Sequence, residues 1–293
     1  MRSFTGKFLI ALATGVIAAV FVAPFAAAIV AALGLRFPFT RIFDRTVIVT
    51  VTIAMAAAAR AIGVRERLER GFRRPIANIP RVTRGFLLAI AAIAVLVMTA
   101  ATLGARAGTG SSEIWREIGK YVVVAGVVAV FEEGFFRALL TSGMIDDYGR
   151  PAGIALSSLI YALAHVVRSP AHFYVTNLDL SAGIRTLALS ADRLGNPNIL
   201  PTLLGLFLIG VVLAEAFVLT GTVYLSIGLH AGFVVGAKMW PHLTGAGRQI
   251  PSWLGGWGSQ PLVSGLAVWI VAIVMLAVVR WLAPARTSAQ QRF

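Results

Sequence analysis

The sequence contains no cysteine and few charged residues, and each absence narrows the class of protein. Without cysteine, disulfide bonds and thiolate metal ligands are excluded. Charged residues make up 13% of the 293-residue chain and hydrophobic residues 58%. Soluble domains average about 25% charged and about 45–50% apolar residues. The composition therefore predicts an integral membrane protein that crosses the bilayer several times.

Acidic residues are scarce as well. The chain has 12 Asp and Glu against 26 Lys and Arg, which gives a net charge of +14. Most of the basic residues lie in short connectors between apolar segments, where they act as topology signals. The positive charge therefore does not indicate nucleic-acid binding, and we expect the lipid bilayer as a partner and no nucleic acid.

Eight segments are apolar and close to the length of about 20 residues that a membrane helix needs. This pattern predicts an all-α fold, a polytopic membrane helix bundle of about eight transmembrane helices. The Arg-rich connector 60–84 is expected in the cytoplasm, and with eight spans both termini are then cytoplasmic too. The segments lie near 8–34, 46–63, 85–105, 119–142, 152–172, 198–219, 222–239 and 261–283.

Few ionisable residues fall inside these segments. Glu132, Glu133 and Glu215 are the acids within them, and Arg137 is the clear basic residue. A charge at the bilayer centre costs about 2.5–3.5 kcal/mol, so such residues are functional candidates. Glu133 and Arg137 are four residues apart and should pair on one helix face. Glu132 is turned away from that face, and we expect Glu215 at the membrane interface.

Two histidines lie inside apolar segments at a similar depth. His165 is in the fifth segment and His230 in the seventh, each near the level of Glu132 if the helices alternate in direction. We therefore predict one site formed by residues from three helices. The simpler alternative is a packing network in which these side chains only hold the helices in place.

Two kinds of chemistry fit this set of residues. Imidazole and carboxylate groups suit zinc, and Glu132, His165 and His230 would then be the ligands. Without a metal, Glu132 would take a proton from water, His165 would hold that water, and His230 would donate to a developing oxyanion. Both routes lead to hydrolysis of a carbonyl compound, with a peptide bond as the expected substrate, and the residues alone do not choose between them.

Three short motifs carry a resemblance to a known family. Glu132-Glu-Gly-Phe-Phe-Arg137 has the form EExxxR, Tyr161-Ala-Leu-Ala-His165 is close to FxxxH, and His230-Ala-Gly-Phe-Val234 follows in order. In this order the chain resembles the CPBP family (also called ABI), the CAAX-protease and bacteriocin-processing intramembrane peptidases. The resemblance covers roughly residues 115–240.

The resemblance implies an intramembrane endopeptidase of glutamic or metal-dependent type, acting on a membrane protein or peptide. It implies that Glu132 activates water, that Glu133 and Arg137 support the site, that His165 positions the water, and that His230 serves the oxyanion. We expect that no cofactor is required, with zinc as the alternative.

The sequence departs from the family's motifs at two positions. The third motif has Asn or Asp four residues after its histidine, and here that residue is Val234, which cannot donate a hydrogen bond. Asn177 and Ser226 are candidates for the missing donor. In the second motif Tyr161 keeps the aromatic ring of the family's phenylalanine and adds a hydroxyl.

On this basis the chain divides into three parts: N-terminal membrane helices with the Arg-rich loop (1–114), a CPBP-like catalytic core (115–240), and a loop, the last membrane helix and a C-terminal tail (241–293). The high Ala and Arg content indicates a bacterial genome rich in GC, and hence a bacterial inner membrane.

Two further functions are compatible with the residues. A set of Glu, His and Arg inside the membrane also builds proton relays, which would suit a proton-coupled transporter. A transporter often shows an internal repeat, and none is visible in the sequence. The change to Val234 is also compatible with a catalytically silent immunity or scaffold protein.

Overall fold

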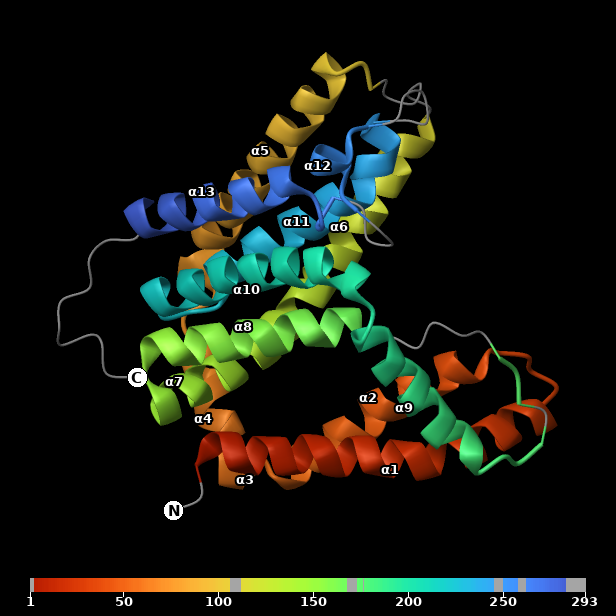
Figure 1. The fold of residues 1–293 in the computed structure, drawn as a ribbon. Helices are drawn as coiled ribbons and strands as arrows, with labels where there is room; N and C mark the ends of the chain where they lie inside the picture. Colours follow the sequence, from red (N-terminus) through yellow and green to blue (C-terminus); the bar gives the residue numbers. More distant parts are fainter. Residues whose placement is uncertain are drawn as a thin grey trace. The chain divides into compact units, whose positions relative to one another are not determined.

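The protein is helical in every regular element of the part that the computed structural model describes, residues 3–105, 112–167, 173–175, 177–244, 250–257 and 262–282. Figure 1 shows these helices and their connections. The predicted all-α membrane bundle is confirmed. Among the described residues, three stretches are long and apolar enough to cross a membrane, and Leu266–Leu282 is a shorter apolar helix. The three stretches are Phe4–Ala32, Ile76–Thr102 and Pro197–Thr220.

Each of the eight predicted segments contains a helix. In chain order these helices are α1 (Phe4–Ala32), α2 (Phe39–Ala57), α5 (Ile79–Thr102), α6 (Ser112–Glu133), α8 (Arg150–Val166), α10 (Leu200–Thr220), α11 (Tyr224–Thr244) and α13 (Leu266–Leu282). The predicted tail beyond α13 lies outside the described residues.

Shorter helices occupy the connectors. They are α3 (Ala59–Ile62), α4 (Val64–Gly71), the 3-10 turn η1 (Ile76–Asn78), α7 (Ser142–Tyr148), α9 (Ser181–Leu194), the 3-10 turn η3 (Pro197–Ile199) and α12 (Ser252–Gly255).

The fourth predicted segment, 119–142, is not one uniform helix. The α-helix α6 ends at Glu133 and continues as the π-helix η2 (Gly134–Thr141), which leads into α7. The wider π-turn shows in the side chain of Thr141, whose hydroxyl donates to the carbonyl oxygen of Phe136, five residues back, at 2.8 Å. Short π-helical segments occur frequently at functional sites.

Contacts divide the chain into two compact units, each formed from two stretches. The first unit comprises Met1–Arg65 and Ala164–Ile199, and the second comprises Glu66–Leu163 and Leu200–Phe293. The division predicted from the sequence is different, with three continuous parts: 1–114, 115–240 and 241–293. Each of the two units combines separate stretches of chain, so the three parts do not correspond to them.

In the first unit α1 packs against α2 and α9. The close approach of α9 to α1 requires a glycine, because a Cβ atom at Gly183 would lie 2.1 Å from the carbonyl oxygen of Val20. The start of α2 is fixed by a backbone hydrogen bond of 2.7 Å from Phe39 to Phe173, and the two rings stack at 5.3 Å. His165 also belongs to this unit, near the start of its second stretch, Ala164–Ile199.

In the second unit α11 packs against α5, α6 and α10. Glycines at positions 228, 232 and 236, spaced four apart, form one face of α11 against α5. Added Cβ atoms at these positions would meet Val82, Ala89 and Ile93 at 2.0, 2.6 and 2.4 Å. Small residues allow membrane helices to approach closely. The spacing of α5 and α11 therefore depends on the absence of side chains next to His230.

Glu215 on α10 is buried within the second unit, and the expectation that it lies at the level of the membrane interface stays a prediction. Its side chain is 3% exposed, and Oε1 accepts hydrogen bonds of 2.9 Å from both Arg150 and Arg280. These arginines come from α8 and α13, which are far away in the sequence. The ion pairs let a carboxylate remain in the interior of the unit.

Candidate active site

The site is built around the junction of α6 and the π-helix η2. Glu133 is the last residue of α6, and Arg137 lies in η2. Both side chains are 0% exposed, and the Nε atom of Arg137 donates to Oε2 of Glu133 at 3.2 Å. The predicted pairing of these two residues is confirmed. A buried charge needs such a partner, because burial of an isolated charge is very costly.

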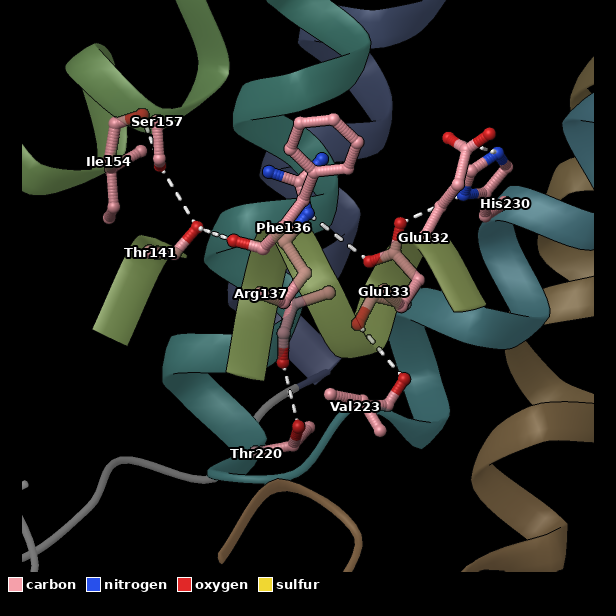
Figure 2. Close-up of polar contacts among 12 residues, drawn as sticks. Glu132, Glu133, Phe136, Arg137, Thr141, Ile154, Ser157, Thr220, Val223 and His230 are labelled. Carbon is pink, nitrogen blue, oxygen red and sulfur yellow. Dashed lines mark hydrogen bonds and ion pairs between the residues drawn. The ribbon is translucent and has the colours of Figure 1, made fainter. Parts of the chain in front are cut away.

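His230 is held by the same carboxylate. Its Nδ1 atom lies 2.8 Å from Oε1 of Glu133, and Figure 2 shows Glu133 between Arg137 and His230. Because Glu133 is paired with an arginine, it is ionised and can only accept hydrogen bonds. The hydrogen of a neutral His230 must therefore lie on Nδ1, which leaves a lone pair on Nε2.

The free nitrogen of this ring faces the other glutamate. Nε2 of His230 lies 3.8 Å from Oε2 of Glu132. This distance is too long for a direct hydrogen bond, and it is short enough for one water to contact both atoms. The Glu132 side chain is 29% exposed, whereas Glu133 is 0% exposed. Glu132 is therefore the more exposed of the two carboxylates, although its Oε2 atom, which faces His230, is itself buried.

Tyr161 on α8 covers one side of this cluster. Its ring meets the ring of His230 edge-on at 6.2 Å and that of Phe136 at 5.1 Å. The guanidinium carbon of Arg137 lies 4.9 Å from the centre of the Tyr161 ring. A cation–π contact of this kind stabilises a cation more strongly when the cation is buried away from water. Among the described residues, the two Nη nitrogens of Arg137 have no hydrogen-bond partner. The face of the Tyr161 ring is therefore a main contact of the guanidinium group.

The structure brings four of the five predicted site residues together. Glu132, Glu133, Arg137 and His230 all belong to the second unit and lie in one cluster. His165 lies in the last turn of α8, four residues after Tyr161, and belongs to the first unit. Its predicted role therefore stays a prediction.

Some contacts that organise the site were not foreseen. The hydroxyl oxygens of Thr141 and Ser157 lie 2.9 Å apart, a hydrogen-bond distance that joins η2 to α8, and the Ser157 hydroxyl also lies 3.2 Å from the carbonyl oxygen of Ile154 (Figure 2). Hydroxyl residues inside apolar helices are the sequence signal for such contacts, because a buried hydroxyl seeks a partner. The spacing of Thr141 and Ser157 does not by itself show that they meet.

The residues present fit a zinc ion only in part. Glu132 Oε2 and His230 Nε2 would supply two ligands, and catalytic zinc sites use three protein ligands. Within the described part of the chain no group of three or more His, Asp or Glu side chains is arranged to hold a metal. The third predicted ligand, His165, belongs to the other unit.

The fold defines the class, an integral membrane protein of helices, and one unit of it gathers two carboxylates, an arginine and a histidine in a cluster. Residues 114–236 match the family model described as Rce1-like, type II CAAX prenyl endopeptidase Rce1-like. The chain thus carries an Rce1-like domain over this stretch, and the resemblance to the CPBP family is confirmed. No curated protein and no solved structure matches the chain.

Proposed function

We propose that the protein is an intramembrane endopeptidase that hydrolyses a peptide bond of a membrane-associated protein or peptide. One observation carries the proposal. Within the stretch that matches an endopeptidase family, the partly exposed Glu132 faces a histidine nitrogen at 3.8 Å, and that histidine is fixed from behind by a fully buried Glu–Arg pair.

The proposed reaction uses Glu132 as the general base. Glu132 takes a proton from a water that also contacts Nε2 of His230, and the water oxygen forms a bond to the carbonyl carbon. The electron pair of the C=O double bond moves to the oxygen and gives an oxyanion. The electron pair of the oxyanion then re-forms the C=O double bond while the C–N bond breaks, and Glu132 returns the proton to the leaving nitrogen.

The other residues hold these groups in place. Arg137 keeps Glu133 ionised, and Glu133 orients the His230 ring by its 2.8 Å contact to Nδ1. With Nδ1 engaged, Nε2 of a neutral His230 accepts a hydrogen bond from the attacking water, whereas a protonated His230 would donate to the oxyanion. His165 is proposed to help position the water, on the basis of the family resemblance alone.

We propose further that no metal is required, and zinc is the alternative. Metal content of the purified protein, measured together with activity before and after chelation, distinguishes the two. Stoichiometric zinc whose removal abolishes cleavage would favour the zinc site, while cleavage by metal-free protein would support the proposal.

Replacement of Glu132 by Gln tests the function. The amide keeps the size and removes the base, so processing should fall by about 10²–10⁴-fold. Comparative membrane proteomics of cells with wild-type protein and Glu132→Gln identifies the unprocessed precursor, and the purified proteins are then compared on that substrate. Glu66→Gln makes the same change at an exposed carboxylate of α4 and should process normally.

Processing by Glu132→Gln at the wild-type rate would contradict the proposal. Uptake of a solute into liposomes driven by a pH gradient, with no cleavage of any precursor, would favour a transporter. Binding of a client without hydrolysis by the wild-type protein would favour a silent immunity or scaffold protein.

We also propose a location and an orientation. The protein is placed in a bacterial inner membrane with the connector 60–84 and both termini in the cytoplasm. The eight arginines of that connector support this orientation, since positive residues are retained on the cytoplasmic side.

A further inference from the structure

The proposed hydrolysis leaves the oxyanion short of a hydrogen-bond donor. His230 donates from Nδ1 to Glu133, so in its neutral form it has only a lone pair to offer at Nε2. Val234, one turn further along the same face of α11, has no polar atom and packs against an apolar cluster. An oxyanion that forms next to His230 therefore needs a donor from another helix.

Of the two candidates named from the sequence, Ser226 is already engaged. Its hydroxyl is fully buried and donates to the carbonyl oxygen of Val223 at 3.0 Å. Asn177 belongs to the first unit, and its role stays a prediction. A donor within the second unit has to come from a side chain that contacts the His230 ring.

Tyr161 is such a side chain. Its ring lies edge-on to His230 at 6.2 Å and beneath the guanidinium of Arg137 at 4.9 Å. The phenol hydroxyl is carried by this ring, which contacts both His230 and Arg137. A phenol is a neutral donor at every pH at which a protein functions, unlike Nε2 of His230.

The ring and the hydroxyl of Tyr161 can be tested separately. The contacts of Tyr161 with Phe136, Arg137 and His230 described above are made by the ring, and a phenylalanine would preserve them. Tyr161 is 3% exposed, so its hydroxyl is held in the interior of the unit. Removal of the hydroxyl alone therefore isolates what it adds to the chemistry of the cluster.

We propose that Tyr161 is a catalytic residue whose hydroxyl donates a hydrogen bond to the oxyanion of the tetrahedral intermediate. The inference rests on the proposed endopeptidase function and adds to it the donor that the His230 helix lacks. The donor comes from α8, and the bond forms only when charge has developed on the carbonyl oxygen, so it lowers the barrier without tightening substrate binding.

Tyr161→Phe is the direct test, because it removes the hydroxyl and keeps the ring. Loss of one oxyanion donor typically lowers kcat about 10²–10³-fold. We expect a fall of this size for cleavage of the identified precursor, with KM and the thermal unfolding midpoint close to those of the wild type. An unchanged kcat, or a loss confined to KM, would overturn the proposal.

Tyr224→Phe is the matched control. The Tyr224 hydroxyl donates to the carbonyl oxygen of Phe72 at 2.7 Å and has a structural role in the same unit. We expect this variant to lower the unfolding midpoint and to leave kcat unchanged. If Tyr161→Phe lowered the midpoint as Tyr224→Phe does and left kcat unchanged, its hydroxyl would be structural and the proposal wrong.

A second-site change gives a readout that packing would not produce. Val234→Asn restores a donor one turn from His230, so the double variant Tyr161→Phe/Val234→Asn should recover at least tenfold of the lost kcat. A double variant with the wild-type unfolding midpoint that stays as slow as Tyr161→Phe would contradict the oxyanion role.

The Glu132→Gln result separates the two proposals. If Glu132→Gln abolishes processing and Tyr161→Phe does not, only the assignment of Tyr161 fails. If Glu132→Gln processes normally, the endopeptidase mechanism fails and the assignment fails with it.

Discussion

Glu132 and Glu133 are neighbours in the chain, yet the structure places them in different environments. Glu133 is 0% exposed and is neutralised by Arg137, while the Glu132 side chain is 29% exposed and faces His230 across 3.8 Å. Two carboxylates in different surroundings can take different roles, one as support and one as acid or base. The difference in environment, rather than in residue type, supports the proposal that Glu132 is the reacting group.

Arg137 tests the supporting role at the level of single residues. Replacement by Met keeps much of the volume and leaves the Glu133 charge buried without its cation, which should cost about 3–5 kcal/mol of stability. The measurement is the unfolding transition of the purified protein in detergent. Cleavage should fall as well, because Glu133 would no longer orient His230.

Two further variants make this result specific. Glu133→Gln/Arg137→Met removes both charges and should recover most of the stability, since a neutral pair carries no uncompensated charge. Lys120→Met breaks an ion pair whose lysine side chain is 62% exposed, and it should change stability little. A stable Arg137→Met protein would show that the buried pair does not hold the site.

At the scale of elements, the position of His230 depends on how closely α11 approaches α5. A Cβ atom at Gly228 would lie 2.0 Å from the backbone oxygen of Val82, so an alanine there forces the helices apart. Overpacking of this kind typically costs about 1–3 kcal/mol. We expect Gly228→Ala to lower the unfolding midpoint and, two residues from His230, to reduce cleavage.

Gly126 on α6 provides the control for this prediction. A Cβ atom there would meet no atom within 4 Å, and alanine is the better helix former by up to about 1 kcal/mol. Gly126→Ala should therefore be neutral or stabilising. Equal effects of the two substitutions would mean that the contact of α5 with α11 is not the cause.

The π-helix is the second feature at this scale. The apolar run 119–142 predicts one membrane helix, and the structure contains α6, η2 and α7 in its place. The π-turn includes Arg137 and continues to Thr141, which bonds to Ser157 of α8. The apolar pattern of this run is the same for an α-helix and for a π-helix. The π-turn therefore could not be predicted from the sequence, because its contact with α8 involves residues from another part of the chain.

At the scale of the whole molecule, labelling of single introduced cysteines tests the proposed orientation in the membrane. The chain contains no cysteine, so every introduced cysteine is a unique labelling site. Ala77→Cys lies in an exposed part of the Arg-rich connector, and Leu35→Cys lies in the exposed connector of α1 and α2. We expect a membrane-impermeant maleimide added outside intact spheroplasts to label Leu35→Cys and not Ala77→Cys.

The labelling result has two controls. The wild-type protein should take no label, and Ala129→Cys, at a position that is 0% exposed, should stay unlabelled in intact and in opened membranes. Labelling of Ala77→Cys from the outside would reverse the proposed orientation and place the termini outside the cytoplasm.

The amino-acid sequence by itself determined the membrane class, the all-α fold and the pairing of Glu133 with Arg137. These features follow from composition and from spacings along one helix, which local geometry fixes. The tertiary structure alone decided that Glu133 also binds His230 and that Glu215 is buried between Arg150 and Arg280. It also decided that Tyr161 lies against the charged cluster. Contacts between helices far apart in the chain depend on packing, which no local pattern encodes.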